Sequence, residues 1–290
     1  MKKVISLLMV LALVAGICVF AGCGKNDEGA QKPEKVTAQV IDVELTQEDY
    51  AFGVDKAQPE LLEKVNAFID KIMADGTFDE ICNHYFGDGE PVPVKSAAKD
   101  ASKDQLVVAT NAGFEPFEYT SGDSYLGIDM EIAQLLATEL GVELVIDNMD
   151  FDAVCLSVGQ HKCDIAMAGL TVKPDREEFV TFSKTYYKAA QKLIVKSDDK
   201  TFEGLATADA ILEKLQSFDA SVNIGYQNGT TGGMYIKNES DYAENNLKVT
   251  AKGYKNGSLA VQDLLNGNIN YVIIDSAPAD CITKSINETL

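Results

Sequence analysis

The chain has 290 residues, of which 46% are hydrophobic, so a sizeable buried core is expected and wholesale disorder is excluded. Its 45 acidic residues outnumber 25 Lys and Arg, and a formal net charge of -20 repels phosphate backbones, which excludes nucleic-acid binding. Two histidines, His84 and His161, leave little material for zinc- or histidine-based catalysis. We therefore expect no metal, no cofactor and no catalytic residue, with both histidines on the surface.

The amino terminus has the pattern of an export signal. Two lysines precede an apolar run over 4–20, which is just short of the ~20 residues that cross a bilayer. The letters FAGC that follow resemble a bacterial lipobox, in which the cysteine is acylated. We predict a lipoprotein signal peptide over 1–22, lipidation of Cys23 and a polar tether over 23–35. A retained membrane-spanning anchor is the alternative.

Residues 36–87 predict two strands and two helices. Apolar alternation over 36–43 and the run 50–54 indicate strands, and a 3.6-residue apolar period runs from Pro59 to Gly76. Thr77 opens a second helix with the pattern of a capping box.

The segment 88–103 is polar, contains two prolines and lacks periodicity, so we predict a linker. Strands and helices then alternate to the end of the sequence. The expected strands are 106–110, 144–146, 165–168, 222–226, 249–251 and 271–274, and the expected helices are 129–140, 207–216, 258–265 and 278–286. Such alternation is typical of βαβ units, whose ligands bind at the carboxyl ends of strands.

Two of the segments that follow predicted strands suit an anion. Arg176 lies in the segment 169–176, and its guanidinium can bind a carboxylate through two parallel hydrogen bonds. The glycine-rich segment 225–233 contributes Thr230 and Thr231, whose hydroxyl and backbone N–H groups suit the same kind of ligand. The alternative for Arg176 is a surface ion pair with a neighbouring acidic residue.

Asp275 follows four apolar residues of the last predicted strand, where its carboxylate can receive an ammonium group. The alternative is an N-cap for the next helix. With Phe114 and Phe151 as apolar walls, these groups complement a zwitterionic α-amino acid, since buried ligand charges must each be paired.

Several motifs between about Gln105 and Ala279 resemble the amino-acid-binding family (family 3) of bacterial ABC-transporter extracellular solute-binding proteins. They are VVATNAGFEPFEY, YLGIDMEIAQLLATELG, MDFDAV, DIAMAGLTVKPDREEFVTFSKTYY, GTTGG and VIIDSAP. The resemblance implies an α/β, two-lobed periplasmic-binding-protein-like fold of type II, with two mostly parallel sheets, flanking helices and two hinge strands. It also implies capture of a free amino acid and its delivery to an ABC permease, without catalysis. Together with the predicted lipidation of Cys23, we expect a lipid-anchored protein on the extracellular face of the cell membrane.

The resemblance assigns ten residues to the ligand site. The residues implied for the α-carboxylate and α-amino groups are Arg176, Thr230, Thr231, Asp275, Gly169 and Thr171. Those implied for the side chain are Phe114, Phe151, Asn111 and Gln227. Because Asn111 and Gln227 are neutral hydrogen-bonding groups, we expect an uncharged polar ligand such as glutamine or cystine. For a cationic amino acid, Glu115 or Glu118 would supply the acid.

The order of segments in this chain differs from the order in that family. Residues 36–87 look like the segment that forms the carboxyl terminus in the family, but here they stand at the front. We interpret this as a circular permutation. The predicted parts are lobe 2 (36–48 and 193–290), lobe 1 (49–87 and 104–192) and a linker joining the ancestral ends (88–103). Sixteen residues reach at most about 50–58 Å, enough to cross one lobe. A domain-swapped dimer and the remnant of a lost tandem module are the alternatives.

Two further questions stay open at the level of the sequence. A ligand-sensing module and a non-transport enzyme on the same scaffold are the alternative functions. The cysteines form no C-x-x-C motif, and we leave undetermined the redox state of four of them: Cys82, Cys155, Cys163 and Cys281.

Overall fold

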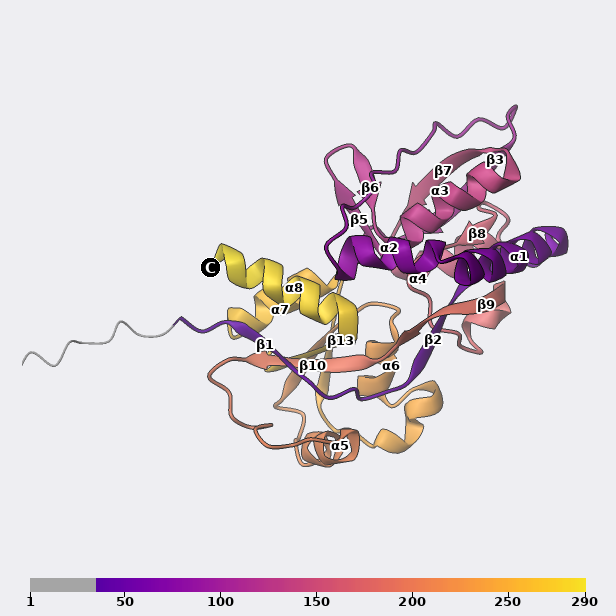
Figure 1. Cartoon of the computed structure of the whole chain (residues 1–290). Coiled ribbons are helices and arrows are strands. Elements are labelled where there is room, and N and C mark those ends of the chain that lie inside the picture. The colour runs from indigo at the N-terminus through magenta and orange to yellow at the C-terminus, as the bar shows by residue number, and fades with distance from the viewer. Residues whose placement is uncertain (1–34) are drawn as a thin grey trace, which may run out of the picture. The chain divides into compact units, whose positions relative to one another are not determined.

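The computed structural model describes residues 35–290, of which 36–290 form one compact unit. The predicted signal peptide, Cys23 and the tether up to residue 34 lie outside the described residues. The described strands form two five-stranded sheets and one three-stranded sheet, and helices lie around them (Figure 1).

Sheet I has the strand order β7-β3-β8-β2-β9. Its strands are β2 (Glu48–Asp55), β3 (Gln105–Thr110), β7 (Glu143–Asn148), β8 (Ile165–Ala166) and β9 (Val180–Ala189). Three helices pack against sheet I: α1 (Pro59–Asp75), α3 (Ile128–Leu140) and α4 (Phe151–Gly159). A fourth helix, α2 (Thr77–Phe86), packs against α1 and α3. The three-stranded sheet follows β3 in the chain and consists of β4 (Gly113–Phe114), β5 (Glu118–Ser121) and β6 (Ser124–Leu126).

Sheet II has the strand order β1-β10-β13-β11-β12. Its strands are β1 (Ala38–Ile41), β10 (Gln191–Lys196), β11 (Asn223–Gln227), β12 (Thr250–Tyr254) and β13 (Tyr271–Asp275). The helices of this part of the chain are α5 (Ala208–Gln216), α6 (Thr231–Lys237), α7 (Gly257–Leu265) and α8 (Ser276–Thr289). Two short 3-10 helices complete the described elements: η1 (Arg176–Glu178) precedes β9 in the chain, and η2 (Ser240–Asn245) lies between α6 and β12.

The α/β prediction is confirmed, but the sheets are mixed rather than mostly parallel. Each contains two parallel and two antiparallel strand pairings. The antiparallel pairings all involve β1, β2, β9 or β10. Parallel neighbours require a long crossover connection, whereas β9 leads directly into β10 through Ala190 and carries the chain from sheet I to sheet II without a helix.

The front segment takes part in both sheets. β1 pairs with β10 at the edge of sheet II, and β2 lies inside sheet I between β8 and β9. The chain therefore also passes between the sheets at 42–47. These contacts join the first elements of the described chain to strands that are more than a hundred residues away in sequence.

The two predicted helices of the front segment form, although the second begins differently. Gly76, with φ of +86°, ends α1 in the left-handed conformation that favours glycine. The predicted capping box at Thr77 is wrong, because Gly76 occupies the N-cap position and no side chain caps it there. The Asp75 carboxylate accepts the Thr77 N–H at 3.0 Å instead.

The predicted linker, 88–103, forms no helix and only one isolated bridge, yet it packs against the three-stranded sheet. Val94 is buried, and its backbone exchanges two hydrogen bonds of 2.9 Å with Tyr125. The linker therefore follows the surface of this part of the chain along β6.

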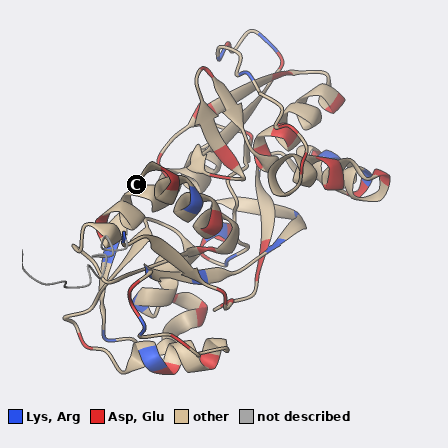
Figure 2. Ribbon diagram, turned by 60° about the vertical axis from the view of Figure 1, so that its left-hand side comes forward, with Lys and Arg blue, Asp and Glu red and all other residues tan. Residues whose placement is uncertain are grey.

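No helix of the described residues combines the length and apolarity that crossing a bilayer requires. Acidic and basic residues are both spread over the described helices and loops (Figure 2).

Candidate functional site

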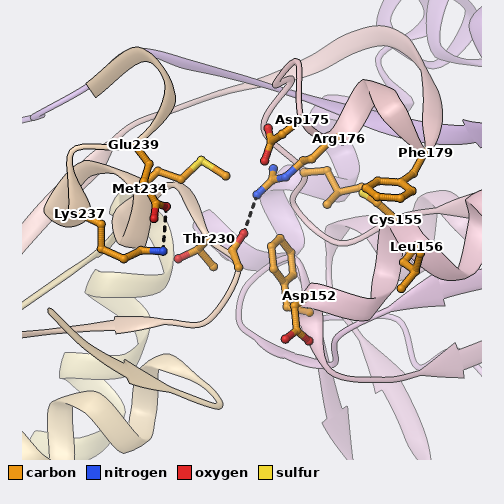
Figure 3. Close-up of a pocket in the computed structure, with 13 residues that line it drawn as sticks. Asp152, Cys155, Leu156, Asp175, Arg176, Phe179, Thr230, Met234, Lys237 and Glu239 are labelled. Carbon is orange, nitrogen blue, oxygen red and sulfur yellow. Dashed lines mark hydrogen bonds and ion pairs between the residues drawn. The ribbon is translucent and has the colours of Figure 1, made fainter. Parts of the chain in front are cut away.

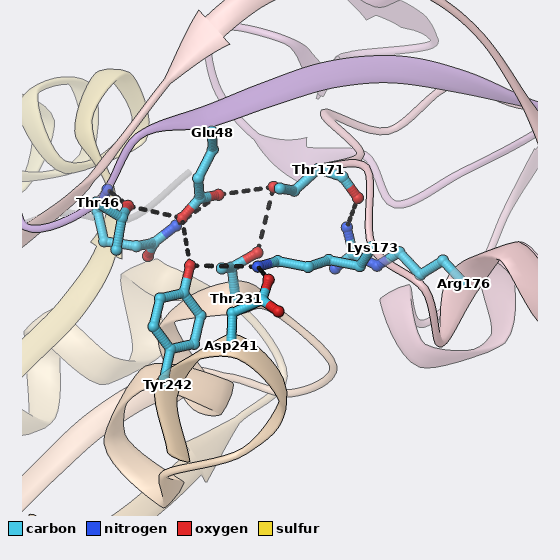
Figure 4. A network of polar contacts seen from close by, with 9 residues as sticks. Thr46, Glu48, Thr171, Lys173, Arg176, Thr231, Asp241 and Tyr242 are labelled. Carbon is cyan, nitrogen blue, oxygen red and sulfur yellow. Dashed lines mark hydrogen bonds and ion pairs between the residues drawn. The ribbon is translucent and has the colours of Figure 1, made fainter. Parts of the chain in front are cut away.

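The loop after β8 and the loop after β11 meet through the predicted head-group residues. The Thr171 and Thr231 hydroxyl oxygens lie 3.2 Å apart. The Arg176 guanidinium donates to the Thr171 carbonyl at 2.8 Å and to the Gly229 carbonyl at 3.1 Å. Figure 4 shows Thr171, Thr231 and Arg176 turned toward one another from the two segments. Three of the residues predicted for the head group are thus brought together.

Arg176 is not a surface residue. It is 6% exposed, and its guanidinium carbon lies 5.2 Å from the centroid of the Phe151 ring. The alternative of a surface ion pair is therefore wrong for this residue. Its donors satisfy backbone carbonyls, and the same fork geometry suits a carboxylate.

Asp275 stands at the N-cap position of α8, but its side chain does not cap the helix. It is buried, and the Tyr50 hydroxyl donates to its Oδ1 at 2.5 Å. Burial, together with the nearby Glu48 carboxylate, raises the pKa of Asp275 to about 7. A cationic group beside Asp275 would favour its ionised form.

Gly169 needs both its small size and its conformational freedom. Its φ is +54°, and a Cβ added there would lie 2.9 Å from the Phe114 ring and 3.2 Å from the Tyr50 ring. Its N–H donates to the buried carboxylate of Asp129 at 2.9 Å. The loop after β8 therefore passes directly against two aromatic rings.

Asn111 and Gln227, predicted to bind the far end of the ligand, contact each other. Gln227 Nε2 donates to Asn111 Oδ1 at 3.0 Å, and Asn111 Nδ2 donates to the Met149 carbonyl. Gln227 Oε1 is buried without a hydrogen-bond partner among the described residues.

Glu118 and Glu115 differ in a way that sequence reasoning did not reveal. Glu115 is exposed, whereas Glu118 is fully buried and both of its carboxylate oxygens lack a hydrogen-bond partner within the described chain. Burial, followed by the charges of Asp129 and Asp275, raises the pKa of Glu118 well above its usual range. Glu118 lies opposite Phe114 in the β4–β5 register, so it belongs to the same region as the predicted site.

Glu48, at the start of β2, joins several segments and was missed by the sequence analysis. Its carboxylate accepts hydrogen bonds from the hydroxyls of Thr46 and Thr171, both at 2.7 Å, and from the Gln191 amide at 3.4 Å (Figure 4). Tyr50, two residues further along β2, was also missed. Glu48 and Tyr50 lie beside and within an apolar strand pattern, and such a pattern predicts packing rather than polar contacts.

A pocket of about 240 Å³ adjoins the carboxylate half of the predicted site (Figure 3). Arg176 and Thr230 line it, together with residues of α4 and α6, whereas Asp275 and Phe114 do not. In this structure several of the predicted site residues contact one another, Asp275 instead contacts Tyr50, and the pocket reaches only the Arg176 side of the site.

The histidines and cysteines give mixed outcomes. The His161 side chain is 63% exposed, as expected, but that of His84 is only 16% exposed and lies 2.8 Å from a Glu131 oxygen. The surface prediction is therefore wrong for His84, because α2 packs against α3. Cys82, Cys155, Cys163 and Cys281 are free thiols, and Cys155 and Cys163 are buried.

The sequence is similar to known extracellular solute-binding proteins. Residues 106–276, more than half of the chain, match the profile of the bacterial extracellular solute-binding proteins, family 3. The arginine-binding extracellular protein ArtP of Bacillus subtilis is 33% identical over 103 residues, which are 36% of this chain and 40% of that protein. ABC transporter arginine-binding protein 1 of Escherichia coli is 27% identical over 179 residues (61% and 65%). The L-cystine-binding protein TcyJ of Escherichia coli is 27% identical over 188 residues (64% and 64%). The chain thus matches less than two thirds of the length of these relatives.

The solved structures with similar folds include amino-acid-binding proteins. An ancestral amino acid-binding protein, described as a precursor of cyclohexadienyl dehydratase, is similar with a TM-score of 0.54 and 28% identity, covering 63% of this chain and 75% of its own. An ancestral arginine-binding protein bound to arginine is similar with the same TM-score and coverage and 29% identity.

Proposed function

The chain belongs to family 3 of the bacterial extracellular solute-binding proteins, and we propose that it captures a free amino acid outside the cell and delivers it to an ABC permease. The observation that carries the proposal is the meeting of Arg176, Thr171 and Thr231 next to the buried Tyr50–Asp275 pair. A backbone bridge between Tyr50 and Thr171 joins the two groups.

These residues divide the head group of an amino acid between them. Arg176 and the two threonines supply donors for the α-carboxylate, and Asp275 supplies the acceptor for the α-ammonium group. Because each buried charge of the ligand would then be paired, its desolvation is compensated. Closure of the two sheets around the ligand would give the permease a liganded form that it can distinguish from the free form.

The side chain of the ligand is proposed to be cationic, as in arginine. The sequence favoured an uncharged ligand through Asn111 and Gln227, but these two amides contact each other, whereas Glu118 is a buried acid with no hydrogen-bond donor among the described residues. Leaving a buried carboxylate unpaired is costly, and a guanidinium carries five donors in a fork that matches a carboxylate. The names of two of the relatives include arginine, which supports this choice.

Isothermal titration of the full-length protein with arginine, lysine, glutamine and cystine tests the proposal. We expect arginine to bind most tightly and Glu118→Gln to weaken arginine at least tenfold while changing glutamine binding little. Glu115→Gln, on the exposed neighbour, is the matched control and should leave arginine binding within twofold. Tightest binding of glutamine or cystine would replace arginine as the ligand, and no binding of any of the four would contradict the function itself.

Membrane attachment is proposed through acylation of Cys23. The support is the export-signal pattern over 1–22 and the lipobox-like letters before the cysteine. Cells fed a labelled fatty acid should transfer the label to the wild-type protein and not to Cys23→Ser. Equal labelling of both proteins would contradict acylation at this residue.

We also propose that residues 36–87 complete the same chain as a circular permutation. β1 and β2 occupy places in both sheets, while the family match begins only at residue 106. The Asn287 amide exchanges hydrogen bonds of 2.9 and 2.8 Å with the backbone of Ala38, so the end of α8 lies beside the start of β1.

A reordered gene tests the permutation. It joins residue 290 to residue 36 through a short glycine-serine linker and opens the chain within 88–103. We expect a monomer by light scattering with unchanged ligand affinity. A stable dimer of the natural chain would indicate domain swapping instead, and an unfolded reordered chain would contradict the permutation.

The alternative of an enzyme has one observation in its favour, the similarity to a dehydratase precursor. Recovery of the bound amino acid after prolonged incubation tests it. Binding and transport require that the ligand is recovered unchanged.

A further inference from the structure

Tyr50 is held rigidly in the core of sheet I. It is fully buried, and its ring centroid lies 5.1 Å from that of Phe117, 5.8 Å from that of Tyr187 and 6.4 Å from that of Tyr186. Its position on β2 is fixed by pairing with Tyr187 on β9. Because protein cores are close-packed, the hydroxyl cannot move far without disturbing these neighbours.

From this position Tyr50 contacts three of the residues assigned to the ligand head group. Its hydroxyl donates to Asp275 Oδ1 at 2.5 Å, its backbone forms a bridge with Thr171, and its ring lies against Gly169. A residue of sheet I thereby reaches the end of β13 in sheet II.

The groups that face Asp275 act in opposite directions. The charge of Glu48 disfavours a second ionised carboxylate at Asp275, and the charge of Asp275 in turn helps to raise the pKa of the buried Glu118. Gln191 lies beside Asp275 in the β10–β13 register, and its amide, like the Tyr50 hydroxyl, favours the ionised form. The Tyr50 hydroxyl lies 2.5 Å from Asp275 Oδ1, which is a short hydrogen bond.

We propose that Tyr50 is a positioning residue for recognition of the α-ammonium group. It holds Asp275 by one carboxylate oxygen, so that the other faces the ligand, and it keeps the carboxylate ionised among the neighbouring acids. The inference rests on the proposed function, because it requires an amino acid to bind at Asp275.

The test compares Tyr50→Phe with Tyr187→Phe, which removes a hydroxyl from the same aromatic cluster. Affinity for L-arginine and L-glutamine is measured by titration calorimetry between pH 5.5 and 9, with circular dichroism to check folding. Loss of a hydrogen bond to a charged group should weaken Tyr50→Phe about tenfold at pH 7. The acid limb of its pH profile should move up by about one unit, so that the loss falls to threefold or less at pH 9. Tyr187→Phe should stay within twofold throughout.

A ligand without the amino group gives a second readout. 5-Guanidinopentanoic acid, the deaminated analogue of arginine, should bind wild type and Tyr50→Phe with equal affinity, because neither complex contains the ammonium–Asp275 pair. A purely structural role for Tyr50 would weaken all ligands equally and leave the pH profile in place, which would overturn the inference.

The two proposals fail in different ways. If the wild-type protein binds no amino acid, the proposed function is wrong. If the wild type binds and Tyr50→Phe behaves like Tyr187→Phe, the function stands and only the role of Tyr50 is wrong.

Discussion

Lys173 and Asp241 form an ion pair of 2.7 Å between the loop after β8 and η2, so the pair joins segments that belong to the two different sheets. The Lys173 side chain is 7% exposed, and its ammonium group also lies 4.6 Å from the centroid of the Tyr242 ring. Figure 4 shows Lys173 extended toward Asp241 and Tyr242, next to the contacts of Glu48. The segments of the two sheets are therefore joined by contacts of Lys173 as well as by contacts between the predicted ligand residues.

We predict that Asp241→Asn weakens ligand binding about threefold to tenfold without changing the ranking of amino acids. Removal of the Asp241 charge leaves the buried Lys173 ammonium group without its carboxylate partner and disfavours the arrangement in which the loop after β8 contacts η2. Stopped-flow measurement should show faster ligand dissociation. Glu139→Gln, which breaks the exposed Lys71–Glu139 pair between α1 and α3, is the control and should have no effect. A change in the ligand ranking would show that Asp241 contacts the ligand instead.

Arg176→Ala should reduce affinity for every amino acid by a hundredfold or more, because the main partner of the α-carboxylate is removed. Arg176→Lys should recover only part of the loss, since lysine keeps the charge but lacks the planar fork. Titration calorimetry with the tightest ligand provides the measurement. An affinity within twofold of wild type for Arg176→Ala would show that the site has been assigned wrongly.

The unliganded protein should become more stable as the pH falls from 8 toward 5.5. Burial raises the pKa of Asp129 to about 7, and burial with Glu48 does the same for Asp275. Because both values exceed those of the unfolded chain, the folded state binds more protons between about pH 4 and 7, and stability is lost as the pH rises through the folded pKa. Each such group contributes up to about 1.4 kcal/mol per pH unit in this window.

Urea unfolding at several pH values measures this effect. Asp129→Asn should flatten the profile, whereas Asp100→Asn, on an exposed carboxyl, should leave its slope unchanged. Stability that falls between pH 7 and pH 5.5 in the wild type would contradict the prediction.

Gly169→Ala should destabilise the protein and also weaken ligand binding. The substitution combines a strained backbone with a close approach to Phe114 and Tyr50. Gly141→Ala is a matched control, because Gly141 has φ of +72° but, apart from its chain neighbours, no heavy atom of the described residues lies within 4 Å of the added Cβ. The control should cost about 1 kcal/mol from backbone strain alone and leave affinity unchanged. Equal effects of the two substitutions on binding would show that the space around Gly169 is unimportant.

Arg176 and Asp275 were predictable because each follows an apolar strand, and residues at strand ends are a recurrent source of binding groups in α/β folds. Tyr50 and Glu48 were not, since a tyrosine within an apolar strand has the pattern of a core residue. Their contact with Asp275 and Thr171 depends on how β2 enters sheet I, and that is a property of the assembled sheet.

Glu115 and Glu118 illustrate the same limit over three residues. Both are acids within three residues of each other, Glu115 between β4 and β5 and Glu118 at the start of β5, and nothing in the local pattern says which is buried. Pairing of β4 with β5 places Glu118 opposite Phe114 and away from solvent, whereas Glu115 stays exposed.

Periodicity predicted which stretches become helices and strands, and the motifs between about Gln105 and Ala279 carried the resemblance to the family, because both are properties of short stretches of the chain. Only the tertiary structure decided that Tyr50 is bonded to Asp275, that Asn111 is bonded to Gln227 and that Glu118, with no hydrogen-bond partner among the described residues, is buried near Asp275. Such contacts join residues far apart in the chain, and their free energies depend on burial and on partners that the local sequence does not specify.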